Sequence, residues 1–292
     1  MSNDQKGISR RDFVGLGAAA GFTLFGAETC AAPTTRTNSE IPLGIVTYNI
    51  ARDWDLRTIV KNCKQLGLKA VELRTTHKHG VEPSLSQAQR KAVRKLFAES
   101  GIVLWALGTT CEFHSPDRAV VERNIEICRS FCRLARDVGA RGVKVRPNGL
   151  PRGVPVKKTI RQIGESLTRC GRIGREFGVE IWCEVHGRGT AEPALMAEIM
   201  RICDHPNVGV TWNCNRQDVK NGSVKQSFNL LKSWIRSVHM HDLYDPAYPY
   251  REFFSLLKAQ GYKGYCLAEI PGSSDPLRVL RYYRALFREL QR

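Results

Sequence analysis

The chain has 292 residues, and its 42% hydrophobic and 25% charged residues are ordinary for a globular protein of one large or two small domains. Its formal net charge of +17 can attract anionic partners, but the sequence has no arginine-rich tail and no basic stretch interleaved with aromatic residues. Much of the excess lies in helix-like segments such as 89–95 and 277–284. We therefore interpret the charge as a basic solvated surface and do not expect nucleic acid as a partner.

The first predicted element is an export signal over residues 1–30. The stretch Ser9-Arg10-Arg11-Asp12-Phe13-Val14 resembles the twin-arginine export motif, and a short apolar run rich in glycine follows it. That run is too short and too rich in glycine to be a good membrane span. We expect export to the periplasm or cell envelope, with no stable membrane span after processing. Residues 31–41 are small and polar, and they read as a linker.

After residue 41, strand-like and helix-like segments alternate. Amphipathic helices are expected at positions such as 117–138 and 158–177, and glycine follows several of the predicted helix ends. The eight strand-like runs cover residues 44–49, 69–74, 102–108, 142–147, 179–185, 208–213, 235–241 and 264–270. Eight such pairs in about 250 residues predict an α/β fold, a (β/α)₈ TIM barrel over residues 42–292. An open doubly wound sheet is less favoured, because no glycine-rich turn follows the first strand.

Histidines gather where the predicted strands end. Six of the seven follow or end a strand, and they are His77, His79, His114, His186, His239 and His241. In a TIM barrel the chemistry takes place at the carboxyl ends of the strands, so this placement predicts an active face. For His77, His79 and His114, which fall in loops, a solvated side chain is the expected state. The ten cysteines form no CxxC pair, and we expect buried free thiols.

Two carboxylates interrupt apolar runs at strand ends. Glu184 lies in WCEVHG and Glu269 in CLAEIPG, where a charged group must be paired, hydrogen-bonded or bound to a metal. The neighbouring predicted strands end in Asn213 and His239. Three oxygen donors and one nitrogen donor suit a divalent ion with open positions for substrate. We expect one such ion, preferably Mn²⁺, with Co²⁺, Mg²⁺ and Zn²⁺ as alternatives.

Four motifs carry a resemblance to a known family: KAVELR, EIWCEVHG, IRSVHMHD and GYCLAEI. Together they resemble the xylose isomerase-like TIM-barrel superfamily, the sugar phosphate isomerase/epimerase group, along the whole barrel. The resemblance implies that Glu184, His239 and Glu269 are metal ligands. Where the family usually has Asp, this chain has Asn213, whose carbonyl oxygen can still bind a metal but carries no charge. His241 stands where the family often has Lys.

The resemblance also implies a reaction. A bound metal would polarise the carbonyl of a carbohydrate substrate and stabilise an enediolate, while Glu184 and Glu269 move the proton as an acid/base pair. We expect an isomerase or epimerase acting on a keto- or aldo-sugar or its derivative. Elimination from a keto-sugar, by a lyase or dehydratase, is equally compatible with an enediolate.

Further polar residues are expected to bind the substrate. Lys144 and Arg146 alternate to one side of their strand, where they can bind anions or sugar hydroxyls or form a salt-bridged barrel layer. Glu72 either contacts substrate hydroxyls or pairs with Lys144. His186 is expected to contact the substrate, and His241 to contact it or to support the metal site.

Two other functions stay open at this point. A nuclease of the endonuclease IV type shares this fold and would suit the positive charge. It needs a carboxylate on the fourth strand, where this chain has Lys144 and Arg146, and a histidine where it has Arg216. A non-catalytic sugar-binding barrel would explain Asn213 as a mark of lost activity. A dimer or a tetramer is compatible with the sequence.

Overall fold

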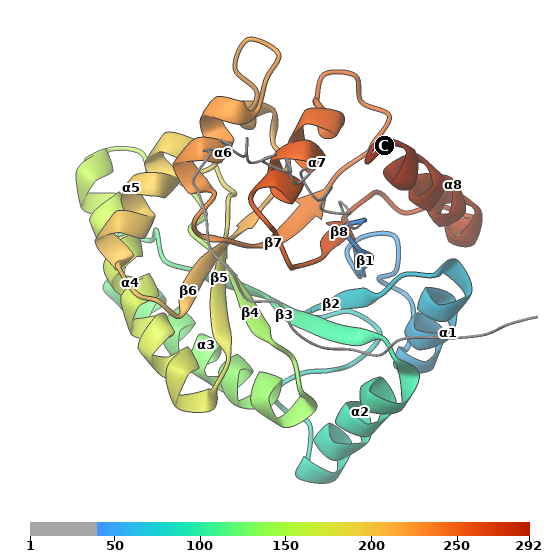
Figure 1. The fold of residues 1–292 in the computed structure, drawn as a ribbon. Helices are drawn as coiled ribbons and strands as arrows, with labels where there is room; N and C mark the ends of the chain where they lie inside the picture. The colour runs from blue at the N-terminus through green and yellow to red at the C-terminus, as the bar shows by residue number, and fades with distance from the viewer. Residues whose placement is uncertain (1–39) are drawn as a thin grey trace, which may run out of the picture. The chain divides into compact units, whose positions relative to one another are not determined.

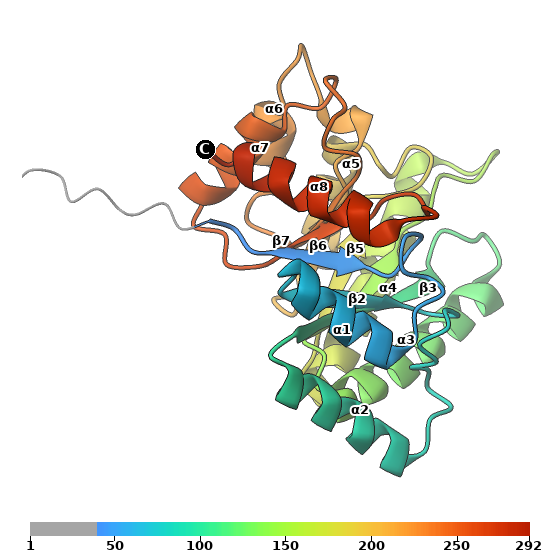
Figure 2. The same cartoon turned by 90° about the vertical axis from the view of Figure 1, so that its right-hand side faces the viewer.

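The computed structural model describes residues 40–292, and they form a closed barrel of eight strands with helices around it (Figure 1). Each strand is parallel to its neighbours, and β1 pairs with β8 to close the sheet. In the perpendicular view, α1 and α8 lie on either side of β1, where the barrel closes (Figure 2). The predicted (β/α)₈ barrel is thus confirmed. The predicted signal over residues 1–30 and nearly all of the linker over 31–41 lie outside the described residues.

Strands and α-helices alternate along this part of the chain, and one 3₁₀ turn is added between β6 and α6. The strands are β1 (Leu43–Val46), β2 (Ala70–Arg74), β3 (Val103–Glu112), β4 (Gly142–Arg146), β5 (Glu180–Glu184), β6 (Val208–Trp212), β7 (Ile235–Met240) and β8 (Cys266–Ala268). The helices are α1 (Leu56–Leu66), α2 (Gln87–Ser100), α3 (Arg118–Val138), α4 (Val156–Phe177), α5 (Pro193–Cys203), the 3₁₀ turn η1 (Arg216–Asp218), α6 (Lys225–Leu231), α7 (Tyr250–Ala259) and α8 (Pro276–Glu289). Among them there is no helix whose length and apolarity would suffice to cross a membrane.

The strand ends differ from the predicted ones in ways that matter for the site. β3 runs on to Glu112, four residues past its predicted end, whereas β8 holds only three residues. Glu184 is the last residue of β5, while Asn213 and Glu269 come directly after β6 and β8. Side chains at strand ends and in the first loop residues therefore build the mouth of the barrel.

Local sequence signals set the helix ends. Ser86 and Gln89 form a reciprocal capping box at the start of α2, and the Asp55 side chain accepts a hydrogen bond from the backbone N–H of Thr58 at the start of α1. α1 and α3 each end at a glycine in the left-handed region, Gly67 with φ 68° and Gly139 with φ 84°. Only glycine adopts that conformation without steric cost, which confirms the predicted helix stops.

Aromatic side chains fill the amino-terminal half of the barrel interior. Trp105 on β3 and Trp182 on β5 lie with ring centroids 5.0 Å apart, and the Trp105 indole donates to Ser237 Oγ on β7, across the barrel, over 3.2 Å. Gly142 on β4 leaves the room they need, since a Cβ there would lie 2.7 Å from the Trp182 ring. Trp182 is thus fully buried in the core of the barrel.

A second core lies between the strands and the helices. Trp212 on β6 is fully buried there and stacks on Phe253 of α7 with centroids 5.2 Å apart. The cysteines of the described region, from Cys63 to Cys266, are all buried and free of disulfide bonds, as expected.

A buried carboxylic acid, Asp218, belongs to this outer core. The Trp212 indole donates to the Tyr248 hydroxyl over 2.8 Å, and that hydroxyl donates to Oδ2 of Asp218 over 3.1 Å. The same oxygen accepts the backbone N–H of Asn215 at 2.7 Å. Burial nevertheless dominates and raises the pKa of Asp218 to about 7.

We predict that this acid makes the protein less stable as the pH rises. In the unfolded chain Asp218 titrates near its ordinary pKa of 3.8, so between about pH 4 and 7 the folded state holds more protons than the unfolded one. The contribution of Asp218 to the free energy of unfolding should fall through that window and then level off. Asp218→Asn keeps an oxygen acceptor without the charge, so it should flatten this dependence and stabilise the protein at pH 8 by on the order of a few kcal/mol.

Urea unfolding of both proteins at several pH values would check this expectation. Glu99→Gln, which removes a carboxylate from an exposed position of α2, serves as the control and should leave the pH dependence as it is. Equal pH slopes for the parent protein and Asp218→Asn would contradict the prediction.

Candidate active site

A cavity of about 380 Å³ opens at the carboxyl ends of the strands. The predicted site residues that line it are Lys144, Arg146, Glu184, His186, Asn213, His241 and Glu269. The two other predicted residues, Glu72 and His239, are fully buried. His239 contacts Glu184 of this lining, and Glu72 contacts His239. A cavity of about 400 Å³ at the amino ends of the strands, beside Arg141, Glu180 and Tyr265, is lined by no histidine. The acid, base and imidazole groups are therefore concentrated at the mouth.

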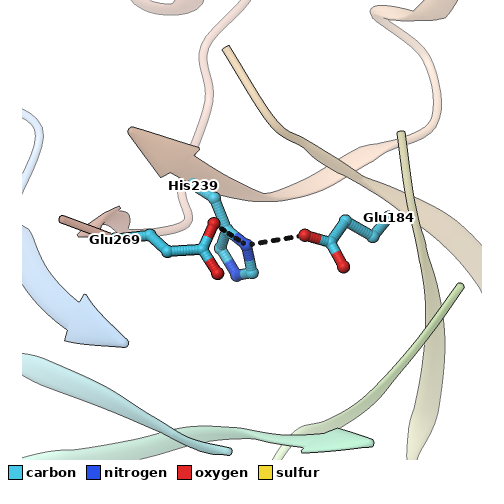
Figure 3. Close-up of side chains that lie close together, drawn as sticks. All are labelled: Glu184, His239 and Glu269. Atoms are coloured by element: carbon cyan, nitrogen blue, oxygen red, sulfur yellow. Dashed lines mark ion pairs between the residues drawn. The ribbon is translucent and has the colours of Figure 1, made fainter. Parts of the chain in front are cut away.

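His239 of β7 is the centre of the polar cluster. Glu184 and Glu269 extend toward it from opposite sides (Figure 3). Its Nδ1 lies 3.4 Å from Oε1 of Glu184 and 3.4 Å from Oε2 of Glu269. One ligand atom of each of these three side chains lies within 4.8 Å of the others. The barrel thus brings together three groups that are far apart in the sequence.

Glu72 is placed differently from what the sequence suggested, because it cannot reach the cavity. Its side chain is completely buried, and its Oε2 lies 3.0 Å from Nε2 of His239. Lys144 makes its hydrogen bond to Glu184 instead, over 2.7 Å. A carboxylate accepts, so Nε2 donates to Glu72. Nδ1 then faces Glu184 and Glu269, and it offers a lone pair to a metal only when the ring is neutral. Glu72 therefore contacts His239 and lies outside the cavity lining.

Charges around the cluster keep its carboxylates ionised. Burial opposes ionisation of Glu184, but the Lys144 ammonium and the His239 imidazole outweigh it and hold the pKa of Glu184 well below its usual range. Burial also opposes ionisation of Glu269, and His239 again outweighs it, so that pKa is lowered too. Although burial disfavours the imidazolium, Glu72, Glu269 and Glu184 together raise the pKa of His239 well above its usual value. The surrounding carboxylates therefore favour a positive charge at this point of the barrel.

Asn213 adds an oxygen to the same cavity. It is 3% exposed, and its Oδ1 is buried without a hydrogen-bond partner anywhere in residues 40–292. Within the described chain, Nδ1 of His239 and Oε1 of Glu72 are likewise buried without a hydrogen-bond partner. Buried polar atoms nearly always have partners. Asn213 lines the cavity together with Glu184 and Glu269, and Nδ1 of His239 lies against both of these carboxylates. This donor set fits a divalent cation, which Glu184, Asn213, His239 and Glu269 would hold.

Glu112 holds two side chains at the cavity wall in place by hydrogen bonds. This residue was not predicted from the sequence. Its Oε1 accepts hydrogen bonds from the guanidinium of Arg146 and, over 2.6 Å, from Nδ2 of Asn148. Oδ1 of Asn148 lies 2.6 Å from Nδ1 of His186. Arg146 therefore lines the cavity as half of an ion pair. No signal marked Glu112, because β3 was expected to end before it.

Arg74 is a further cavity residue that sequence reasoning missed. It ends β2, donates to the backbone oxygen of Thr75 over 2.8 Å, and lies 5.8 Å from the centre of the Tyr48 ring. A usable signal existed, since Arg74 follows Glu72 by two residues and so faces the same side of the strand.

The loop histidines are less exposed than expected. His79 is 6% exposed, with Nε2 2.8 Å from the backbone oxygen of Arg74 and Nδ1 3.0 Å from the backbone N–H of Val81. The expectation of a solvated side chain is wrong for His79, because its ring is buried and forms hydrogen bonds with the backbone of Arg74, at the end of β2, and of Val81, in the loop that follows. His241 does line the cavity, with Nδ1 3.4 Å from the backbone oxygen of Glu269.

Several known structures have a fold similar to that of this chain. The chain is similar to 3-keto-D-glucoside 4-epimerase YcjR from E. coli, with 14% identity, a TM-score of 0.72 and coverage of 86% of this chain and 100% of the other. It is similar to D-psicose 3-epimerase from Clostridium cellulolyticum H10, with 14% identity, a TM-score of 0.72 and coverage of 85% and 98%. For the IolI protein with a bound zinc atom, the identity is 16%, the TM-score 0.68 and the coverage 86% and 96%.

Identity this low establishes a common fold and no more. A search of curated proteins found no significant match. The family model described as xylose isomerase-like TIM barrel matches residues 60–290, which is most of the chain. The chain therefore belongs to the xylose isomerase-like TIM barrel family.

Proposed function

We propose that the protein is a divalent-metal-dependent sugar isomerase or epimerase that acts on a keto- or aldo-sugar or a derivative of one. The observation that carries the proposal is the placement of Glu184 and Glu269 on opposite sides of His239 in one cavity (Figure 3). The cavity, at about 380 Å³, lies in the range that suits a small molecule. Likeness to a D-psicose 3-epimerase and a 3-keto-D-glucoside 4-epimerase supports a carbohydrate substrate.

The proposed metal ligands are Glu184, Asn213, His239 and Glu269. A divalent ion held by them would polarise a substrate carbonyl and so acidify the carbon beside it. Mn²⁺ is our first choice because oxygen donors outnumber nitrogen, with Co²⁺, Mg²⁺ and Zn²⁺ as alternatives. The zinc atom in the similar IolI structure supports a divalent ion in this fold.

The two glutamates would move the proton. Both have lowered pKa values, so either carboxylate is ionised and able to accept a proton from the carbon beside the carbonyl. Inversion would require the opposite carboxylate to have taken a proton from solvent, which it would then deliver to the other face of that carbon. Return of a proton to the neighbouring carbon, with a proton moved between the two oxygens, would shift the carbonyl. Arg74, Lys144 and Arg146 place positive charge along the cavity wall, where it would stabilise the enediolate.

The alternatives fit these contacts less well. An endonuclease IV-type site needs a carboxylate on the fourth strand, and β4 instead contributes Lys144, paired with Glu184, and Arg146, paired with Glu112. A sugar-binding barrel without catalysis would not require the buried Glu72–His239 contact that orients an imidazole toward two carboxylates. Elimination from a keto-sugar begins with the same proton removal, and product analysis would separate it from epimerisation.

Metal analysis and a substrate panel test the proposal directly. Purified protein should contain close to one divalent ion per chain by mass spectrometry. Chelation should abolish the turnover of at least one ketose, aldose or keto-glycoside in the panel, and added Mn²⁺ should restore it, because the carbonyl is then polarised again. Protein that binds no divalent ion even when Mn²⁺ is supplied in excess would contradict the proposal.

Replacement of the acid/base residues should stop the reaction without unfolding the barrel. Glu269→Gln and Glu184→Gln each keep the size of the side chain but cannot take a proton, so we expect turnover to fall by at least about 10²-fold. Deuterium uptake from heavy water into the substrate would show whether each variant still opens the carbon–hydrogen bond from one face. Glu99→Gln on exposed α2 is the control. Parent-like turnover in Glu269→Gln, with an unchanged melting curve, would show that the proton is moved by another group.

Asn213 offers a prediction about metal affinity that does not depend on activity. Asn213→Asp adds a carboxylate charge beside the orphaned oxygen position, so it should tighten Mn²⁺ binding by roughly tenfold or more in isothermal titration calorimetry. Asn221→Asp adds the same charge on an exposed turn and should leave the affinity unchanged. An unaltered dissociation constant for Asn213→Asp would mean that position 213 does not bind the metal.

A further inference from the structure

Two hydrogen bonds connect the loop after β4 with the loop after β5 at the cavity wall. The backbone N–H of Leu150 donates to the backbone oxygen of Arg188 over 3.0 Å, and the Arg188 guanidinium donates to the backbone oxygen of Leu150 over 3.0 Å. Gly187 has φ 93°, and a Cβ on it would lie 2.7 Å from the carbonyl carbon of Asn148. Only glycine permits this close approach, which sets the side chains of Asn148 and His186 against each other.

Hydrogen-bond chemistry then fixes the direction of every bond in the chain from Glu112 to His186. Glu112 is paired with Arg146, so it is ionised and can only accept. The amide nitrogen of Asn148 must therefore face Glu112, at 2.6 Å, and its oxygen must face His186. That oxygen also only accepts, so Nδ1 of His186, 2.6 Å away, must carry the hydrogen.

This direction leaves Nε2 of the neutral His186 ring with a lone pair. The ring is half-buried and lines the cavity, and its hydrogen bond within the described chain is made through Nδ1. The neighbouring wall is rich in groups that only donate, namely Arg74, Lys144 and Arg146. The carboxylates of Glu184 and Glu269 are acceptors in the same lining, at the proposed metal site. A sugar hydroxyl that accepts from one of the donors can donate to a further acceptor, which Nε2 provides.

We infer that Glu112 and Asn148 hold His186 as its Nδ1–H tautomer, so that Nε2 accepts a hydrogen bond from a hydroxyl group of the substrate. Glu112 and Asn148 are positioning residues in this arrangement, and His186 selects substrates with a hydroxyl at the matching carbon. The acceptor role rests on the proposed sugar substrate, whereas the tautomer depends only on the protein.

Two other histidines provide internal references, because their contacts impose the opposite tautomer. Nδ1 of His79 accepts the backbone N–H of Val81 at 3.0 Å, and Nδ1 of His205 accepts the backbone N–H of Asn207 at 3.2 Å. A nitrogen that accepts from a backbone N–H carries no hydrogen of its own, so both neutral rings carry it on Nε2.

Nuclear magnetic resonance of ¹⁵N-histidine-labelled full-length protein tests the tautomer. Long-range ¹H–¹⁵N spectra of the Mg²⁺-loaded protein, at a pH where the rings are neutral, should show His186 as Nδ1–H and both His79 and His205 as Nε2–H. His186→Gln assigns the signal. Asn148→Gly removes the side-chain amide, and glycine adopts the φ of 76° at this position without strain. In this variant His186 should exist as a mixture of both tautomers. Asn148→Asp keeps an acceptor and should retain Nδ1–H. An Nε2–H tautomer of His186 in the parent protein would overturn the inference.

Sugar titration tests the acceptor role. D-tagatose, D-fructose and any sugar turned over in the panel should shift the Nε2 signal of His186 when bound. Asn148→Gly should raise KM by about tenfold with little change in kcat, since a contact to a non-reacting hydroxyl stabilises substrate and transition state alike. Combining it with His186→Gln should add little, because both remove one contact.

The outcomes separate this inference from the proposed function. A sugar that is turned over without moving the Nε2 signal overturns the acceptor role and leaves the proposed function standing. A protein that shows the expected tautomer but binds and converts none of the sugars overturns the proposed function, and the acceptor role with it.

Discussion

One buried imidazole among three carboxylates is the constraint on which this barrel mouth depends. His239 is fully buried, with Glu72 behind it and Glu184 and Glu269 in front. Three negative charges in so small a volume repel one another strongly unless positive charge lies between them. The carboxylates raise the pKa of His239, so they favour a positive charge on its ring. A metal would supply it more completely, and it would return the imidazole to the neutral form in which Nδ1 is a ligand.

The surrounding residues adjust this balance. Lys144 neutralises Glu184 from the side away from His239, so Glu184 has two positive neighbours. Asn213 contributes an oxygen without adding a fourth negative charge to the group. Arg74 and Arg146 bring further positive charge to the wall. The cavity is thus electrostatically prepared for a group that becomes negative during a reaction, which is what proton removal beside a carbonyl produces.

Much of the fold and part of the site could be predicted from the sequence, because periodicity and strand ends are local signals. Glu184, His239 and Glu269 were found as polar residues that interrupt apolar strands, and the closed barrel brings them together. Alternation says which face a side chain takes but not its depth, so Glu72 was assigned to the cavity although it lies under His239. Glu112 needed the length of β3 and the irregular register between β3 and β4, which depend on tertiary packing.

The two tryptophans in the barrel interior limit how a ligand can enter and leave the site. Trp105 and Trp182 fill the amino-terminal half of the barrel. The cluster around His239 is therefore reached from the carboxyl-terminal mouth of the barrel. In the proposed reaction, substrate, product and displaced water would all pass the same loops, those that carry His186, Asn215 and His241. A bound product therefore blocks the next substrate until it leaves. The loops at this opening would govern both the speed of release and the choice of molecules admitted.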